Sequence, residues 1–261
     1  MISTVYAAAT RAAGGTWHTC IPGHVEDGAD DVIHGYSVQK AAVAVALLTE
    51  VDRGSLSLGD RVRLTDADIL GGSGTYHLQG IWGDEITVAG FLTAMLLVSD
   101  NTAVRLCARV LPAARINEVL GSLGLVHTRV EPAGDRFFLG VTTPRETADL
   151  LWRLATGKLL APATTAFVLR VMRSTSGYHD GVRRDMSSSE RSRVATKHGA
   201  DYDISGAARH EAGIIFDPAG QPRLPYAMFA TALPDRDNYG STHPATQAHA
   251  TIGRAMLDWC A

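Results

Sequence analysis

The feature that most constrains this chain is an uninterrupted apolar run at positions 41–48, Ala-Ala-Val-Ala-Val-Ala-Leu-Leu. The segment is rich in alanine and leucine and contains no proline, and Gly54 follows it, a residue suited to the left-handed turn that ends many helices. It therefore predicts a helix buried in the interior of the protein. Ser37 and Lys40 stand just before the run, one helical turn apart and on one face.

A lysine beside a buried helix suggests chemistry, because burial of an unpaired ammonium group is costly. It can act as a base toward a serine hydroxyl if burial and neighbouring positive charge lower its pKa from about 10.4 to about 7–8. Ser37 is thus a candidate nucleophile and Lys40 a candidate base. A helix-capping serine followed by a solvent-exposed lysine would give the same spacing, so the rest of the chain must decide between these interpretations.

Patterns typical of strands lie near both ends of the chain, and patterns typical of helices fill its middle. The predicted strands cover residues 16–21, 32–36, 193–197, 207–216 and 224–233. The predicted helices cover residues 3–13, 37–53, 87–98, 102–110, 116–123, 143–154, 162–172 and 244–259. We predict an α/β (α+β) fold, in which one antiparallel sheet built from both termini is flanked by helices and carries an inserted all-helical domain.

Residues 1–36 and 186–261 are expected to form the sheet domain and residues 37–185 the helical domain, with the active site in the cleft between them. A glycine-rich stretch at 71–74 predicts a flexible loop, because it lacks the strand-then-helix context of a phosphate-binding loop. The serine-rich stretch at 187–189 is expected to be an exposed loop.

Composition narrows the function. The net charge of −3 argues against nucleic acid as a partner. No apolar run approaches the roughly 20 residues that span a bilayer, so we expect no membrane association. The first 13 residues lack a basic start and a continuous apolar core, which predicts a cytoplasmic protein unless a leader has been removed. The sequence does not define the oligomeric state.

The cysteine and histidine spacings do not suggest a metal site. The three cysteines, Cys20, Cys107 and Cys260, are far apart in the sequence and are expected to be free thiols in a reducing compartment. His243 and His249 fall on the predicted C-terminal helix and are expected to lie at the surface. We therefore expect neither a metal nor another cofactor.

Two further motifs follow Ser37-x-x-Lys40 in the chain: Ser99-Asp100-Asn101 and Lys197-His198-Gly199. Alone, the first would be a turn between two helices and the second a lysine at a strand end. In this order, the three motifs resemble the S-x-x-K, S-D-N and K-T-G set of class A β-lactamases and penicillin-binding proteins. The resemblance runs from about residue 15 to about residue 258, and is clearest at residues 51–56, 97–103, 141–144 and 210–215.

The resemblance implies a serine hydrolase that forms an acyl-enzyme with an amide or ester, β-lactams included. Ser37 would be the nucleophile, Lys40 would share or relay its proton, and Ser99 would pass a proton to the leaving group. The implied substrate-binding residues are Asn101, Lys197, His198, Gly199 and Ala200. Lys197 would hold Lys40 less protonated and attract a substrate carboxylate, and the backbone N–H groups of Ser37 and Ala200 would form the oxyanion hole.

Two departures from the family pattern stand out. His198 replaces the small hydroxyl residue that helps to bind a substrate carboxylate; it could turn away from the cleft, reshape substrate choice, or titrate near neutral pH. Between residues 128 and 143, class A β-lactamases carry a longer loop with a Glu-x-x-x-Asn pattern, whose glutamate activates the deacylating water. Here the loop offers only Glu131 and Asp135 as candidate acids, and both could equally be solvated side chains.

The sequence therefore predicts acylation by β-lactams with poor deacylation. An amidase, esterase or acyltransferase acting on a specialised metabolite inside the cell is the alternative enzyme. A ligand-binding protein with a degenerate lactamase pocket is the alternative outside enzymes, although the intact Ser37, Lys40, Ser99 and Lys197 argue against it.

Overall fold

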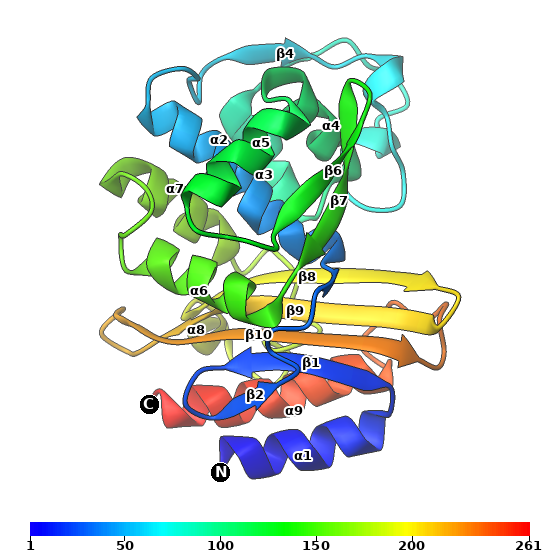
Figure 1. The fold of residues 1–261 in the computed structure, drawn as a ribbon, viewed down its shortest axis with the longest axis vertical. Helices are drawn as coiled ribbons and strands as arrows, with labels where there is room; N and C mark the ends of the chain where they lie inside the picture. The colour runs from blue at the N-terminus through cyan, green and yellow to red at the C-terminus, as the bar shows by residue number, and fades with distance from the viewer.

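The computed structural model describes all residues, 1–261, and is organised around a five-stranded antiparallel sheet. Its strand order is β2-β1-β10-β9-β8, so strands from the two ends of the chain lie side by side (Figure 1). The strands are β1 (Thr16–Ile21), β2 (Val25–Asp27), β8 (Val194–Asp203), β9 (Gly206–Phe216) and β10 (Pro222–Leu233). The predicted antiparallel sheet built from both termini is confirmed.

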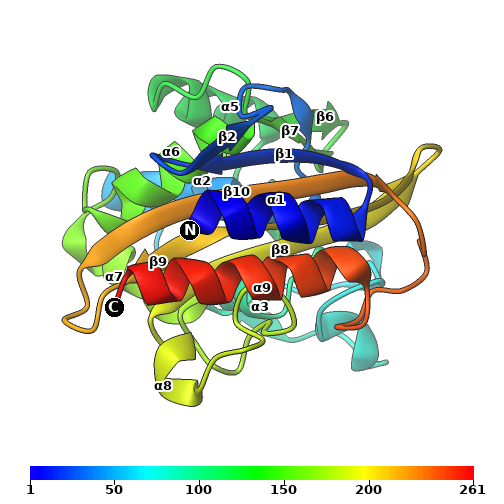
Figure 2. The ribbon, with the colours of Figure 1, turned by 90° about the horizontal axis from the view of Figure 1, so that it is seen from below.

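The two terminal helices cover one face of this sheet. Helices α1 (Ile2–Ala13) and α9 (Pro244–Trp259) lie side by side across it, as the view from below shows (Figure 2). Between them and the strands is an apolar core that includes Tyr226, Met228 and Ile252. These two helices cover one face of the sheet. The helices from the middle of the chain, called here the helical half, pack on the opposite face.

Helix α2 (Lys40–Asp52) is the centre of the helical half, and its residues from Lys40 to Glu50 are all buried. The surrounding helices are α3 (Val88–Leu97), α4 (Asn101–Val110), α5 (Ala113–Ser122) and α7 (Pro162–Met172). The apolar core around α2 continues to Ala212 and Phe229 on the sheet, so the two halves share one core. The apolar run at 41–48 therefore forms a buried helix, as predicted, and the other helices of the helical half pack around it.

Helix α6 (Pro144–Ala155) lies against the main sheet, in contact with β1, β9 and β10 (Figure 1). The smaller elements are β4 (Arg61–Arg63), β5 (Glu85–Thr87), η2 (Asp66–Asp68), η3 (Tyr76–Leu78) and α8 (Ser188–Arg191). None of the helices combines the length and the apolar character needed to cross a membrane.

The segment predicted as a loop at residues 129–140 is instead a β-hairpin of β6 (Arg129–Ala133) and β7 (Arg136–Thr142), with β3 (Ile33–His34) paired to β7. The side chains of Val130 and Phe137 are buried in the main core, which anchors both strands. The predicted strand at 32–36 is thus only two residues long and belongs to this second sheet.

Two smaller expectations were wrong. His243 and His249 are buried, because α9 packs its inner face on the sheet. Residues 187–189, expected as an exposed loop, are exposed but form the start of the short helix α8, because the Ser187 side chain caps it and Glu190 completes a capping box. The expectation of free thiols is confirmed for all three cysteines.

The start of α6 fastens the hairpin to the rest of the molecule. Thr143 caps the helix by accepting a hydrogen bond from the Glu146 N–H at 3.1 Å. The Glu146 carboxylate in turn accepts backbone N–H groups from Val126, His127 and Thr128 at 2.7, 2.9 and 2.7 Å, and the Thr128 hydroxyl at 2.6 Å. The Glu146 side chain therefore accepts the backbone N–H groups of the three residues just before β6.

We predict that Glu146→Ala lowers the free energy of unfolding by about 2 kcal/mol, because it leaves several backbone donors without a charged acceptor. Chemical denaturation measures the effect. Asp149→Ala is the matched control on the same helix, since Asp149 is half exposed and pairs only with Arg153, and it should cost less than about 0.5 kcal/mol. Equal losses in the two variants would contradict the anchoring role of Glu146.

Candidate active site

Ser37 lies in η1 (Tyr36–Gln39), a single 3-10 turn that leads directly into α2. The preceding residue, Tyr36, has a φ of +44°, a left-handed conformation that is uncommon for a residue with a side chain. This turn brings the chain from β3 into the central helix and leaves Ser37 half-buried at the wall of a cavity of about 730 Å³. The residues that line this cavity also include Ser99, Asn101, His198, Gly199 and Ala200.

Lys40 begins α2 and is fully buried. Its Nζ donates to the Ser99 Oγ at 3.1 Å, to the Ser99 carbonyl oxygen at 2.5 Å and to the Asn101 Oδ1 at 2.7 Å. In the ammonium form of Lys40, all three N–H groups are engaged by the Ser99-Asp100-Asn101 turn. The first and second motifs, 59 residues apart at Lys40 and Ser99, are thus in direct contact.

The turn between α3 and α4 holds Ser99 in place. Ser99 has a φ of +57°, and the Asp100 side chain caps α4 by accepting the Ala103 N–H at 3.0 Å. The second carboxylate oxygen of Asp100 accepts the N–H groups of Thr75 and Tyr76 at 2.6 and 2.9 Å. Asp100 therefore points away from the cavity and fastens the turn, while Ser99 and Asn101 face the lysines.

Lys197, on β8, completes the cluster from the sheet side. Its Nζ donates to the same Ser99 Oγ at 3.0 Å and to the His198 carbonyl oxygen at 2.8 Å. The Ser99 hydroxyl oxygen consequently lies between two buried amines that come from different halves of the molecule. Such a hydroxyl can receive a proton from one side and pass its own to a group in the cavity.

Burial controls the charge of this cluster. It lowers the pKa of Lys40 from 10.5 to about 7, although the nearby Asp100 carboxylate opposes the shift. Burial, and then the positive charge of Lys40, hold the pKa of Lys197 well below its usual value. Two ammonium groups so close to one oxygen repel each other, so near neutral pH the site contains a free amine that can act as a base.

Gly199 is the point at which the sheet meets the nucleophile. A Cβ atom at this position would lie 2.9 Å from the Val38 backbone nitrogen and 3.0 Å from that of Ser37. Backbone atoms cannot move aside as a flexible side chain can, so only glycine lets β8 approach η1 this closely. This contact places the next residue, Ala200, at the cavity wall beside Ser37.

The structure does not bring Glu131 and Asp135 into the cavity. Glu131 is exposed on β6, and Asp135 is exposed in the hairpin turn with its only ion pair to Arg136 at 4.0 Å. The hairpin instead presents Phe137, Phe138 and Leu139 to the cavity. Glu131 pairs with Phe138 in the hairpin and therefore shares its face, but only the apolar side chains reach the cavity lining.

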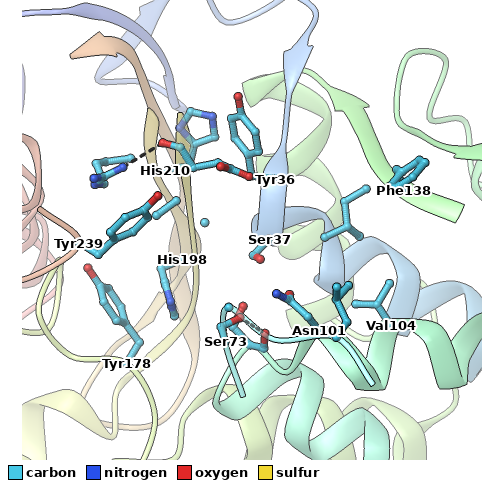
Figure 3. Close-up of a pocket in the computed structure, with 18 of the residues that line it drawn as sticks. Tyr36, Ser37, Ser73, Asn101, Val104, Phe138, Tyr178, His198, His210 and Tyr239 are labelled. Atoms are coloured by element: carbon cyan, nitrogen blue, oxygen red, sulfur yellow. Dashed lines mark hydrogen bonds between the residues drawn. The ribbon is translucent and has the colours of Figure 1, made fainter. Parts of the chain in front are cut away.

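His198 lies at the edge of β8 and stacks on Tyr178, with ring centroids 3.8 Å apart and planes at 22° (Figure 3). Burial, together with the positive charges of Lys197 and Lys40, keeps the pKa of His198 well below its usual value. The ring is therefore neutral near pH 7. The interpretation that His198 titrates near neutral pH was wrong.

Several cavity residues were not predicted from the sequence, because they come from loops whose positions depend on the fold. Ser73 donates from its hydroxyl to the Ser99 carbonyl oxygen at 2.6 Å, and the Asn101 side chain donates to the Gly71 carbonyl oxygen at 2.9 Å. The glycine-rich loop at 71–74 was the available signal for them. Other unpredicted lining residues are Tyr36, Tyr178, Arg209 and Tyr239.

Solved structures of other proteins share this fold. A β-lactamase from Sphaerobacter thermophilus is 26% identical, with a TM-score of 0.80 over 99% of this chain and 96% of that one. A β-lactamase from Chitinophaga pinensis is 21% identical, with a TM-score of 0.84 over 100% and 98%. The protein PBP-A is 21% identical, with a TM-score of 0.78 over 98% and 96%. A search of curated protein sequences found no match.

The fold and these similarities define the class as a serine hydrolase of the β-lactamase-like kind. The chain belongs to the β-lactamase enzyme family, whose sequence model matches residues 23–260. The predicted family resemblance is confirmed, as is the fold class that it implied.

We predict that Gly199→Ala lowers the free energy of unfolding by about 1–3 kcal/mol, because the added methyl group meets backbone atoms of η1. Gly121→Ala is the matched control: Gly121 lies in α5, where an added methyl group would face open space, so this change should be neutral or stabilise by up to about 1 kcal/mol. Thermal or chemical denaturation distinguishes the two. A Gly199→Ala variant as stable as the parent would show that β8 can move away from Ser37.

Proposed function

We propose that the protein cleaves a small-molecule amide or ester, β-lactams included, through an acyl-enzyme on Ser37. The observation that carries the proposal is the Ser99 Oγ held 3.1 Å from Lys40 Nζ and 3.0 Å from Lys197 Nζ, beside the cavity that Ser37 lines. A nucleophile, a base and a proton carrier are the parts that acyl transfer requires. The cavity would be the cleft between a sheet domain, residues 1–36 and 186–261, and a helical domain, residues 37–185.

In the first half of the reaction, neutral Lys40 would remove the proton of the Ser37 hydroxyl as its oxygen attacks the substrate carbonyl. The backbone N–H groups of Ser37 and Ala200 would stabilise the oxyanion. When the intermediate collapses, the Ser99 hydroxyl would give its proton to the leaving nitrogen or oxygen and regain one from Lys40 or Lys197. Asn101 would hold both Lys40 and the substrate amide.

In the second half, water would have to attack the ester on Ser37. The one carboxylate among the cavity-lining residues, Asp201, is exposed on the last part of β8, and the hairpin contributes apolar side chains instead. We therefore expect the acyl group of a penicillin to remain on Ser37 for a long time. A substrate whose own groups assist hydrolysis would turn over faster.

The compartment is also a proposal. All three cysteines are buried free thiols, and free thiols fit a reducing environment. We therefore propose that the protein acts in the cytoplasm on a small molecule, with no nucleic acid or membrane as partner.

Incubation with benzylpenicillin should add the mass of one intact penicillin to the protein, on Ser37, and the adduct should persist. Intact-mass spectrometry followed by peptide mapping measures this. Ser37→Ala should give no adduct, because the nucleophile is gone. Rapid hydrolysis without a detectable adduct would contradict poor deacylation, and an unmodified Ser37 in folded protein would contradict the proposed function.

The acylation rate should rise with pH and level off above about pH 7, since the pKa of Lys40 is lowered to about 7 and its neutral form increases as pH passes that value. The adduct formation rate across about pH 5–9 measures the profile. Lys40→Arg should be inactive throughout, because a guanidinium does not lose its proton in this range. A rate that still climbs at pH 9 would show that another group is the base.

Leu139→Glu should shorten the lifetime of the penicillin adduct by at least about tenfold, because it places a carboxylate in the cavity that can activate water. Leu139→Gln is the matched control, of similar size but without a basic oxygen, and should leave the lifetime close to that of the parent. The decay of adduct mass after removal of free penicillin gives both rates. Equal lifetimes would mean that a missing base is not what slows deacylation.

A further inference from the structure

The cavity continues past the edge of β8 to a second wall that consists mainly of rings. Tyr178, His198 and Tyr239 lie on this wall, across the cavity from Asn101, Val104 and Phe138 (Figure 3). His198 follows Lys197 on β8, and its ring lines the cavity whereas Lys197 does not. The surface next to this lysine is therefore formed by the stacked rings of His198 and Tyr178.

The one lysine or arginine in the cavity lining, Arg209, has no free donor for an anion. Each of its five N–H groups can be assigned to a backbone carbonyl oxygen. The accepting carbonyls, at 2.8–3.3 Å, are those of Asp201, Ala208, Arg236 and Asn238. The ring of Tyr239 covers one face of the guanidinium, 4.4 Å from its carbon.

The two lysines are also engaged by the protein. Lys40 uses its three donors on the Ser99 turn, and Lys197 is 1% exposed and bound to the Ser99 Oγ and the His198 carbonyl oxygen. Neither lies in the cavity lining, whereas the carboxylate-bearing Asp201 does. A substrate carboxylate at this end would lose its hydration, meet no free cationic group in the cavity lining and approach another negative charge.

We propose that the His198–Tyr178 wall selects substrates that carry an uncharged, planar group where a penicillin carries its carboxylate. His198 is then a specificity-determining residue: its ring closes the approach to Lys197 and provides a face for stacking. This inference rests on the proposed acylation of Ser37 and adds the class of molecule that is acylated, a neutral amide or ester.

The test compares benzylpenicillin with its methyl ester, in which one added methyl group removes the charge at this position. Acylation rates from intact-mass spectrometry are each divided by the rate at which hydroxide opens the same lactam, so that intrinsic reactivity cancels. The two adducts differ in mass by one methylene group and can be followed in one mixture. The methyl ester should react at least as fast as the free acid after this correction.

A free acid that reacts faster than its ester would overturn the inference while leaving the acylation of Ser37 intact. If neither compound adds mass to Ser37, the proposed function itself is wrong, and this inference with it. The two failures are therefore distinguishable in a single experiment.

A substitution tests whether His198 sets the preference between the acid and the ester. His198→Thr removes the stacked ring and supplies a hydroxyl donor, so it should shift the acid-to-ester rate ratio toward the acid by about tenfold, the usual effect of one hydrogen bond to a charged group. His127→Thr makes the same exchange at an exposed position outside the cavity and should leave the ratio unchanged. An unchanged ratio in folded His198→Thr would show that His198 does not set the preference.

Discussion

The structure depends on one hydroxyl oxygen, the Ser99 Oγ, that accepts hydrogen bonds from two buried amines. Lys40 comes from the central helix and Lys197 from the edge of the sheet, so the shared contact joins the two halves at the cavity. Buried like charges repel, and both amines are removed from water. The cost is reduced when the site contains a neutral amine near pH 7, which is also the state that a base needs. The packing that buries Lys40 and Lys197 thus also lowers the pKa of their amines.

The backbone is arranged so that these groups can meet. Tyr36 and Ser99 adopt left-handed conformations on either side of the cavity, and such conformations persist only where surrounding contacts hold them. Asp100 supplies those contacts for Ser99 by capping α4 and binding the loop at 75–76. On the other side, Gly199 lets β8 reach the backbone of η1. These contacts hold the backbone on both sides of the cavity, and the hairpin β6–β7 contributes apolar side chains to its lining.

The residues that line the cavity bear differently on acylation and on the later steps, deacylation and substrate choice. The machinery for acylation is complete in the sense that a candidate nucleophile, base and proton carrier adjoin one cavity. The cavity lining offers apolar side chains from the hairpin and the His198–Tyr178 stack where the proposed reaction would need a group that activates water or receives a substrate carboxylate. Under the proposed function, acylation would be kept while deacylation and substrate choice change.

The sequence by itself determined the elements whose signals are local. The apolar run at 41–48, the Thr143 cap of α6 and the apolar stretches of β9 and β10 depend on neighbours a few residues away, so α2, α6 and the main sheet were predicted. The motifs at Ser37, Ser99 and Lys197 were also readable, since each has its own short pattern. Only the tertiary structure decided that Glu131 and Asp135 lie outside the cavity, that His249 is buried, and that Tyr178 stacks on His198. Those outcomes depend on contacts between segments far apart in the chain, whose geometry no local pattern specifies.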